Sequence, residues 1–251
     1  MTFALGQRID LSKAANDSGF ELITYEADGS LALLAGADTA LRPTVRIAEG
    51  GWEIALGDAA VARTIAEEGR FPVSQNGCFI ADGTGALTEL LLRAWRLDRA
   101  LPQAPLRRFE AAVAAPEDLT FRTDVERLVR QRIGQSLFRD ALMDYWDGRC
   151  AVTGVEQSAL LRASHIKPWA DCASDAERMD VFNGLLLTAD WDAAFDAGLI
   201  TFDLDGRAIT SQRLEINAQV RLDPDRLRIV RPLTDDHRRY LDWHLAHVFQ
   251  G

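Results

Sequence analysis

Residues 149–198 constrain the fold of this chain more than any other segment. Residues 149–153 are short and strand-like, and residues 160–166 are typical of a second strand. Pro168 ends that strand, because proline has no amide hydrogen to donate to a neighbouring strand. The segment is therefore expected to begin as two short strands joined by a turn.

A helix is predicted next, after a polar loop. Thr188 is suited to cap a helix over residues 189–197, and Gly198 is suited to end it. Residues 199–210 then carry a hairpin signal, since Asp205-Gly206 separates two short apolar runs. The predicted order is strand, strand, helix, followed by a hairpin.

Three polar residues with complementary chemistry lie along this segment: His165, Asn183 and Asp192. Phosphodiester hydrolysis needs a base that activates water and a cation that neutralises the charge growing on the phosphate. A neutral imidazole suits the first role at physiological pH. Carboxylate oxygens suit a hard divalent ion such as Mg²⁺. If the strands pack against the helix, these residues predict metal-assisted cleavage of a phosphodiester.

The same stretch carries a resemblance to a known family. Its motifs are Arg149-Cys-Ala-Val-Thr-Gly, Ala163-Ser-His-Ile-Lys-Pro-Trp, Asn183-Gly-Leu-Leu-Leu and Asp190-Trp-Asp-Ala-Ala-Phe-Asp-Ala-Gly-Leu-Ile. In this order they resemble the HNH endonuclease family, in the branch seen in bacterial restriction-type nucleases, over about residues 135–210. Residues 240–249 resemble the closing helix of these proteins, within a helix predicted over residues 235–249. The family fold is a ββα-metal finger, which agrees with the predicted strand, strand, helix order.

The resemblance implies a role for each residue of the series. His165 matches the general base, which polarises the attacking water, and Asn183 matches the asparagine that holds the loop and the histidine in register. Asp192 matches the third signature position, often histidine, where it would coordinate the metal. The implied substrate is DNA, and the implied cofactor is Mg²⁺ or Mn²⁺. A neutral histidine base predicts activity that rises through roughly pH 6–7.

The metal-ligand set departs from the family pattern. Ser164 stands where many members carry aspartate or histidine as a second ligand. Asp196 follows Asp192 by four residues, on the same helical face, which makes it the candidate second ligand. The alternative for Asp196 is a carboxylate that bonds local backbone at a helix end. Cys150 is followed by Val-Thr-Gly rather than a paired cysteine, so no structural zinc is implied.

Two cations flank the histidine and are candidate nucleic-acid contacts. Arg162 and Lys167 are within reach of a bound phosphate, and Lys167 is preferred because strand alternation places it on the same side as His165. A solvated surface position is the alternative for each. His244 and His247 lie one helical turn apart, a spacing compatible with a metal pair or with packing and capping.

Composition limits the class of protein. The chain has 251 residues and a formal net charge of −10, which argues against nonspecific DNA binding by the whole surface. Cations are nevertheless dense in residues 122–149, within a helix predicted over residues 124–146 with a break at Gly134. No long apolar run predicts a membrane span, and no secretory signal is visible, which favours the cytoplasm. The sequence leaves a homodimer open.

Two domains are predicted, and the fold class is α+β. Residues 20–56 read as a small antiparallel sheet, and Asp58 and Gly69 delimit a helix between them. With a helix over residues 87–101, these elements predict a mixed α/β N-terminal domain over residues 1–101. Alanine and proline predict a linker over residues 102–120. The nuclease domain, a ββα-metal finger with flanking helices, takes residues 121–251.

The N-terminal domain resembles no family. Its place ahead of a nuclease suggests that it selects the target of a restriction or defence enzyme. Trp52, Phe71 and Phe79 could stack on a base, or they could be core residues. Two other hypotheses stay open: a catalytically weak DNA-binding module, and a nuclease effector activated by a ligand of residues 1–101.

Overall fold

The structure is a computed structural model that describes residues 4–26, 29–34, 39, 41–48, 51–114 and 124–251. It divides into two compact units, Met1–Arg99 and Ala100–Gly251. The predicted linker contains helix α4 (Gln103–Ala114), so most of it is folded and lies within the second unit. Pro105 and Phe109 of α4 are both buried, and removal of their apolar surface from water stabilises this helix. Residues 115–120 of the predicted linker lie outside the described residues.

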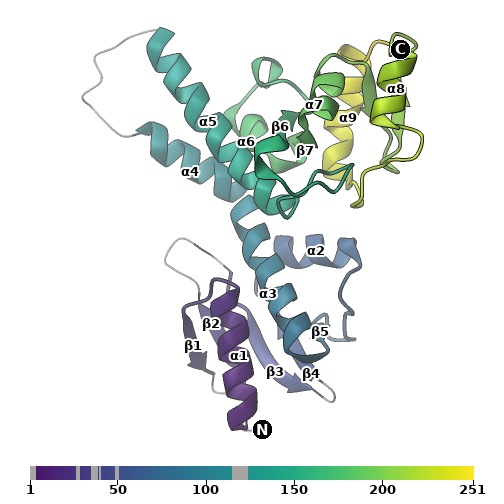
Figure 1. Cartoon of the computed structure of the whole chain (residues 1–251). Helices are drawn as coiled ribbons and strands as arrows, with labels where there is room; N and C mark the ends of the chain where they lie inside the picture. Colours follow the sequence, from purple (N-terminus) through teal and green to yellow (C-terminus); the bar gives the residue numbers. More distant parts are fainter. Residues whose placement is uncertain (1–3, 27–28, 35–38, 40, 49–50, 115–123) are drawn as a thin grey trace. The chain divides into compact units, whose positions relative to one another are not determined.

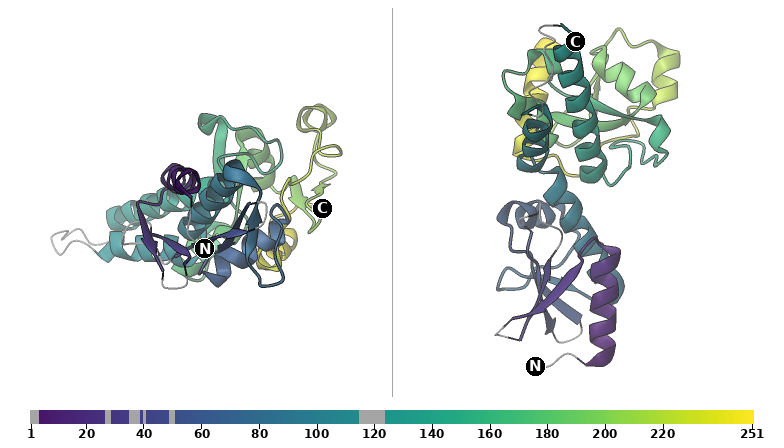
Figure 2. Two further views of the ribbon diagram at one scale, coloured as in Figure 1. Left: turned by 90° about the horizontal axis from the view of Figure 1, so that it is seen from below. Right: turned by 90° about the vertical axis from the view of Figure 1, so that its left-hand side faces the viewer.

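The first unit is a five-stranded antiparallel sheet with helices. Its strands pair in the order β1-β2-β3-β4-β5, which confirms the predicted antiparallel sheet. Both views in Figure 2 show α1 and α3 on the same side of this sheet. The elements are α1 (Leu5–Asp17), β1 (Leu22–Tyr25), β2 (Leu31–Leu34), β3 (Thr44–Ala48), β4 (Gly51–Ala55), α2 (Ala59–Glu68), β5 (Phe79–Ala81) and α3 (Gly83–Ala100).

The ends of α2 follow the predicted capping residues. Asp58 accepts hydrogen bonds from the amides of Ala60 and Val61, each at 2.9 Å. Gly69 ends the helix with a φ of 65°, a left-handed conformation that glycine adopts without steric cost. Local side-chain chemistry therefore delimits this helix.

The aromatic residues considered for base stacking belong to the core. Trp52, Phe71 and Phe79 are 5%, 8% and 2% exposed. A ring stacks on a base only if its face is accessible, so the base-stacking hypothesis is wrong for these three residues. Burial of apolar area against the sheet explains their position instead.

The second unit contains the predicted strand, strand, helix order, although with different strands. Its sheet pairs β6 antiparallel with β7, and the hairpin β8-β9 and the closing helix are present as predicted (Figure 1). Besides α4, the helices and strands are α5 (Asp124–Tyr145), β6 (Leu161–His165), α6 (Asp175–Met179), β7 (Gly184–Thr188), α7 (Ala189–Asp196), β8 (Ile200–Phe202), β9 (Ala208–Thr210), α8 (Ile216–Leu222) and α9 (Asp235–His247), with 3-10 turns η1 (Ser158–Leu160), η2 (Trp169–Asp171) and η3 (Val181–Asn183).

The strand predicted over residues 149–153 is wrong. Asp147 and Gly148 have positive φ, and the Gly154 amide donates to the Cys150 carbonyl at 3.1 Å, so this segment is a turn. The partner of β6 is β7 instead, with His165 opposite Gly184. All five residues of β7 are buried, which is why their apolar run does not alternate with polar residues.

The break predicted at Gly134 is also wrong, because α5 runs unbroken through it. A Cβ at this position would lie 2.2 Å from Cη2 of Trp169 and 3.2 Å from Cε2 of Phe109. The glycine therefore permits a close approach of the Trp169 ring to the helix, and it does not end the helix.

Candidate active site

The His165 ring is held in one orientation by two neighbours. It stacks on the Phe138 ring of α5 with 3.7 Å between centroids and 14° between planes. Its Nε2 lies 3.0 Å from the carbonyl oxygen of Arg178. A carbonyl cannot donate, so in the neutral ring Nε2 carries the proton and Nδ1 carries the lone pair. Among the described residues, nothing hydrogen-bonds Nδ1, which leaves it available to accept a proton from water.

Burial gives this histidine an unusual acidity. It lowers the pKa of His165 from 6.5 to about 4, because the charged imidazolium is poorly solvated at this position. The ring is therefore neutral at physiological pH, as a general base requires. The rise of activity expected at pH 6–7 moves down to about pH 4, where the neutral form becomes the major one.

Gly184 makes the stacking of Phe138 on His165 possible. It lies opposite His165 in the β6-β7 ladder. A Cβ there would lie 2.5 Å from Cζ of Phe138 and 2.9 Å from both methyl carbons of Leu142. The glycine of the Asn183-Gly motif thus lets α5 pack directly against the strand that carries the histidine.

The variant Gly184→Ala tests this packing. We expect it to lower the free energy of unfolding by about 1–3 kcal/mol, since the added methyl group must displace Phe138 or Leu142. Urea unfolding followed by circular dichroism measures the change. Gly85→Ala is the matched control, because a Cβ there meets nothing within 4 Å in helix α3. Equal free energies of unfolding for the two variants would contradict the close packing of Phe138 and Leu142 against Gly184.

Asn183 closes the loop between the two strands. Its side chain is fully buried. Its Oδ1 accepts from the Lys167 amide at 2.8 Å, and its Nδ2 donates to the carbonyls of Lys167 at 3.1 Å and Glu177 at 3.2 Å. Its backbone carbonyl accepts from the Ile166 amide at 3.0 Å. These bonds join the two ends of the loop that follows His165, so Asn183 acts on structure and does not face a substrate.

Arg178 is a site residue that sequence reasoning missed. Its carbonyl orients His165, and its guanidinium donates to the carbonyls of Trp169 at 3.2 Å and Cys172 at 2.7 Å. It also forms an ion pair with Asp175 at 3.1 Å. One residue thereby fixes both the loop and the histidine. Arg178 lies in the short helix α6, and a lone arginine there gives no sequence signal for this role, because its partners are mainly backbone carbonyls.

A pair of carboxylates lies on the face of α7 that meets β6. The Ser164 hydroxyl donates to Oδ1 of Asp196 at 3.3 Å. Burial raises the pKa of both Asp192 and Asp196, the Asp192 charge raises that of Asp196 further, and a hydrogen bond from Ser164 lowers each. The structure therefore brings together the two predicted metal ligands and the serine that replaces a familiar ligand.

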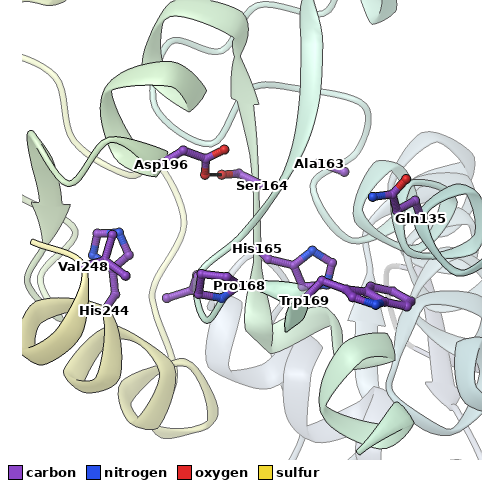
Figure 3. A pocket seen from close by; sticks show the side chains of 10 residues that line it. Gln135, Ala163, Ser164, His165, Pro168, Trp169, Asp196, His244 and Val248 are labelled. Carbon is purple, nitrogen blue, oxygen red and sulfur yellow. Dashed lines mark hydrogen bonds between the residues drawn. The ribbon is translucent and has the colours of Figure 1, made fainter. Parts of the chain in front are cut away.

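His165, Ser164 and Asp196 line one cavity (Figure 3). The cavity has a volume of about 410 Å³. Ser164 and His165 are successive strand residues, so their side chains leave opposite sides of β6, yet both reach the cavity. Figure 3 shows Ser164 and Asp196 directed at each other and His165 beside Trp169. The remaining lining residues are Gln135, Ala163, Ile166, Pro168, His244 and Val248.

The donor set fits a hard divalent cation. A serine hydroxyl has one proton and can donate to only one carboxylate at a time, so Asp192, which is half-buried, and Asp196, which is exposed, keep carboxylate oxygens that a cation can bind. Carboxylate and hydroxyl oxygens suit Mg²⁺, which keeps several waters and needs only one or two protein carboxylates. In the part of the chain that the structure describes, no group of three or more His, Cys, Asp or Glu side chains could hold a metal ion.

The two candidate phosphate contacts differ in their surroundings. Nζ of Lys167 is paired with Glu177 at 2.9 Å and lies 5.8 Å from the centroid of the Trp243 ring. Arg162 is exposed, donates to the carbonyls of Ala159 and Leu161, and lowers the pKa of Asp192 by its charge. The charge of Arg162 therefore acts on the acidic face, whereas Lys167 is engaged with Glu177.

The arginines ahead of the site hold structure together. Arg130 forms an ion pair with Asp175. Arg139 donates to the carbonyls of Leu161 at 2.8 Å and Ser158 at 2.9 Å, which fixes the start of β6. These two cations of residues 122–149 are engaged within the fold.

His244 and His247 do not form a metal pair. Nδ1 of His244 lies 3.0 Å from the Thr201 hydroxyl, and its Nε2 lies 3.2 Å from the Phe195 carbonyl. Nδ1 of His247 lies 2.9 Å from the Trp243 carbonyl. Packing and hydrogen bonding within the fold therefore account for both rings.

Buried histidines give the second unit a pH-dependent stability. Burial lowers the pKa of His165 and His244 to about 4 and that of His237 to about 3. Unfolded histidine titrates near 6.5, so between pH 6.5 and about 4 the unfolded chain binds more protons, and the free energy of unfolding falls as the pH falls. Asp192 and Asp196 act in the opposite direction, because their pKa values are raised in the folded chain. At pH values above the ordinary aspartate pKa, protonation of these two carboxyls stabilises the fold as the pH falls.

We expect the urea midpoint of the chain to be lower at pH 5 than at pH 7. Circular dichroism at the two pH values measures it. His237→Phe removes one of the three groups and should reduce the difference, because His237 contacts the Tyr145, Trp146 and Phe182 rings and phenylalanine can fill the same space. A midpoint that is equal or higher at pH 5 would contradict the linkage.

Two antiparallel strands are followed by a helix, His165 and Asp196 line one cavity, and Asp192 lies beside Asp196 on α7, which is an arrangement suited to a nuclease-type hydrolase. Residues 150–203 match the family model described as HNH endonuclease, so this part of the chain is similar to HNH endonuclease domains. The match spans β6, β7 and α7 and confirms the predicted resemblance. No curated protein matches the chain. Among the described residues, no helix is both long and apolar enough to cross a membrane.

Proposed function

We propose that the second unit is a divalent-metal-dependent endonuclease that hydrolyses DNA phosphodiester bonds. One observation carries the proposal. Within the segment that matches the HNH family, a neutral imidazole with its proton fixed on Nε2 lines the same cavity as Ser164 and Asp196, and the charge of Asp192 acts on Asp196 from the same helix. A base and a site for a hard cation are the two elements that this reaction requires.

Each residue has a defined task in this proposal. Nδ1 of His165 accepts a proton from the attacking water, while the Arg178 carbonyl keeps the ring in the correct tautomer. Asn183 keeps the loop in register. Asp192 and Asp196 would hold Mg²⁺ or Mn²⁺, which supplies neutralisation of the charge developing on the phosphate. We assign the phosphate contact to Arg162 ahead of Lys167.

The first unit is proposed to select the target, as in a restriction or defence nuclease, or to respond to a ligand that activates cleavage. Trp52, Phe71 and Phe79 are buried, so recognition by this unit would use other side chains.

A second function is a DNA-binding module that cleaves poorly. The small donor set favours it, since among the residues that the structure describes only two carboxylates and one hydroxyl meet at the acidic face.

A digestion experiment with the full chain separates these functions. Supercoiled plasmid and genomic DNAs that are unmodified, methylated or hydroxymethylated are incubated with Mg²⁺, with Mn²⁺ or with EDTA. The endonuclease proposal expects nicked and linear products with metal and none with EDTA. Retarded but uncut DNA under every condition would support the binding module instead. Cleavage of one modified DNA alone would support target selection.

A further inference from the structure

The helix that carries both candidate ligands is short. Helix α7 has eight residues, and helices of this length are marginal on their own in water. Asp196 is its last residue. Fraying of the final turn would therefore move this carboxylate directly, so the position of Asp196 depends on what holds the end of the helix.

His244 of α9 holds that end. Its Nε2 donates to the Phe195 carbonyl at 3.2 Å, since a carbonyl cannot donate, and its Nδ1 then accepts from the Thr201 hydroxyl at 3.0 Å. Its ring is 1% exposed and stacks on the Phe195 ring with 4.0 Å between centroids and 7° between planes. One side chain thus joins α7, β8 and α9 at the residue next to Asp196.

The segment that follows His244 reinforces this end of α7. Gln250 donates from Nε2 to the Ala197 carbonyl and from its backbone amide to the Gly198 carbonyl, each at 2.9 Å. A Cβ on Gly198 would lie 2.1 Å from the Val248 carbonyl oxygen, so glycine is needed for this approach. Carbonyls at the end of α7 therefore receive donors from the closing helix and the residues after it.

The geometry points to His244 as a positioning residue for the metal site, acting through the Phe195 carbonyl to fix Asp196. This inference rests on the proposed function, in which Asp196 is a metal ligand. His244 lines the same cavity, and Figure 3 shows its ring apart from the Ser164–Asp196 pair, so its effect on Asp196 passes through the Phe195 carbonyl. Partners that orient a metal ligand change metal affinity about 10–100-fold when they are removed.

The test compares variants of the full chain. His244→Phe keeps the ring stacking and loses both hydrogen bonds, whereas the amide of His244→Gln can still donate to the Phe195 carbonyl. His247→Phe is the matched control, one turn away on the exposed side of α9. Hydrogen–deuterium exchange of the metal-free protein, followed in the peptide over residues 189–199, measures how well the last turn of α7 is protected. Calorimetric titration with Mn²⁺ reports the affinity.

For His244→Phe we expect faster exchange at the end of α7 and a dissociation constant for Mn²⁺ raised about tenfold. His244→Gln should lie closer to the wild type, and His247→Phe should equal it. If His244→Phe does not fold, Thr201→Val replaces it, because loss of the hydroxyl frees the ring while the packing stays. Unchanged exchange or unchanged affinity would overturn the role of His244. A wild type that binds no Mn²⁺ would instead overturn the metal assignment in the proposed function.

Discussion

Replacing His165 with alanine is expected to lower the rate of metal-dependent DNA cleavage by about 10²–10⁴-fold, the contribution typical of a general base. Nδ1 of His165 has no hydrogen-bond partner among the described residues, while Nε2 is bound to the Arg178 carbonyl. The variant therefore removes the one basic nitrogen that the structure leaves available at this side of the cavity. Single-turnover cleavage of plasmid DNA in Mg²⁺ measures the effect.

Two further variants give this prediction its controls. His165→Gln retains an amide that can donate to the Arg178 carbonyl but has no basic nitrogen, so it should lose as much activity as His165→Ala while keeping the fold. His247→Ala removes a histidine outside the cavity and should cleave at the wild-type rate. Cleavage by His165→Gln within a few-fold of the wild type would exclude the histidine as the base.

Asp196→Asn is expected to abolish most metal-dependent cleavage and to weaken Mn²⁺ binding by at least tenfold, because a hard cation loses a charged ligand. The change should not lower the free energy of unfolding. Burial raises the pKa of Asp196 and the Asp192 charge raises it further, so removing the charge relieves an unfavourable pair. Calorimetric titration, urea unfolding and a cleavage assay against metal concentration measure the three effects.

Asp190→Asn is the matched control on the same helix. Asp190 lies in the first turn of α7 and faces Arg221 at 3.5 Å near the surface, away from the acidic pair. It should leave metal affinity unchanged. Equal weakening by Asp190→Asn and Asp196→Asn would show that general charge on α7, and no defined ligand, attracts the cation.

Elements delimited by local chemistry were predictable from the sequence. Asp58 and Gly69 mark the two ends of α2 through bonds within one helical turn, and Asp205-Gly206 marks the β8-β9 hairpin. The strand at residues 149–153 and the break at Gly134 were mispredicted, each for its own reason. At residues 149–153 the backbone forms a turn flanked by the positive-φ residues Gly148 and Gly154, and at Gly134 the absence of a Cβ allows the close approach of the Trp169 ring to an unbroken helix.

Helices without a strong local pattern escaped prediction. Helix α1 buries only Leu11, Ala14 and Ala15 along one side, and α4 begins within an alanine- and proline-rich stretch. These helices are stabilised by packing against segments that are distant in the sequence, so neighbouring residues alone do not predict them.

The sequence by itself determined the order His165, Asn183 and Asp192, their HNH resemblance and the helical spacing that places Asp196 beside Asp192. Only the tertiary structure decided which atoms can act. The Arg178 carbonyl selects the tautomer of His165, burial lowers the pKa of this histidine, and the Ser164 hydroxyl donates to Asp196 of α7. These partners lie 13 to 32 residues away along the chain, so their effect arises from distances in space and not from spacing in sequence.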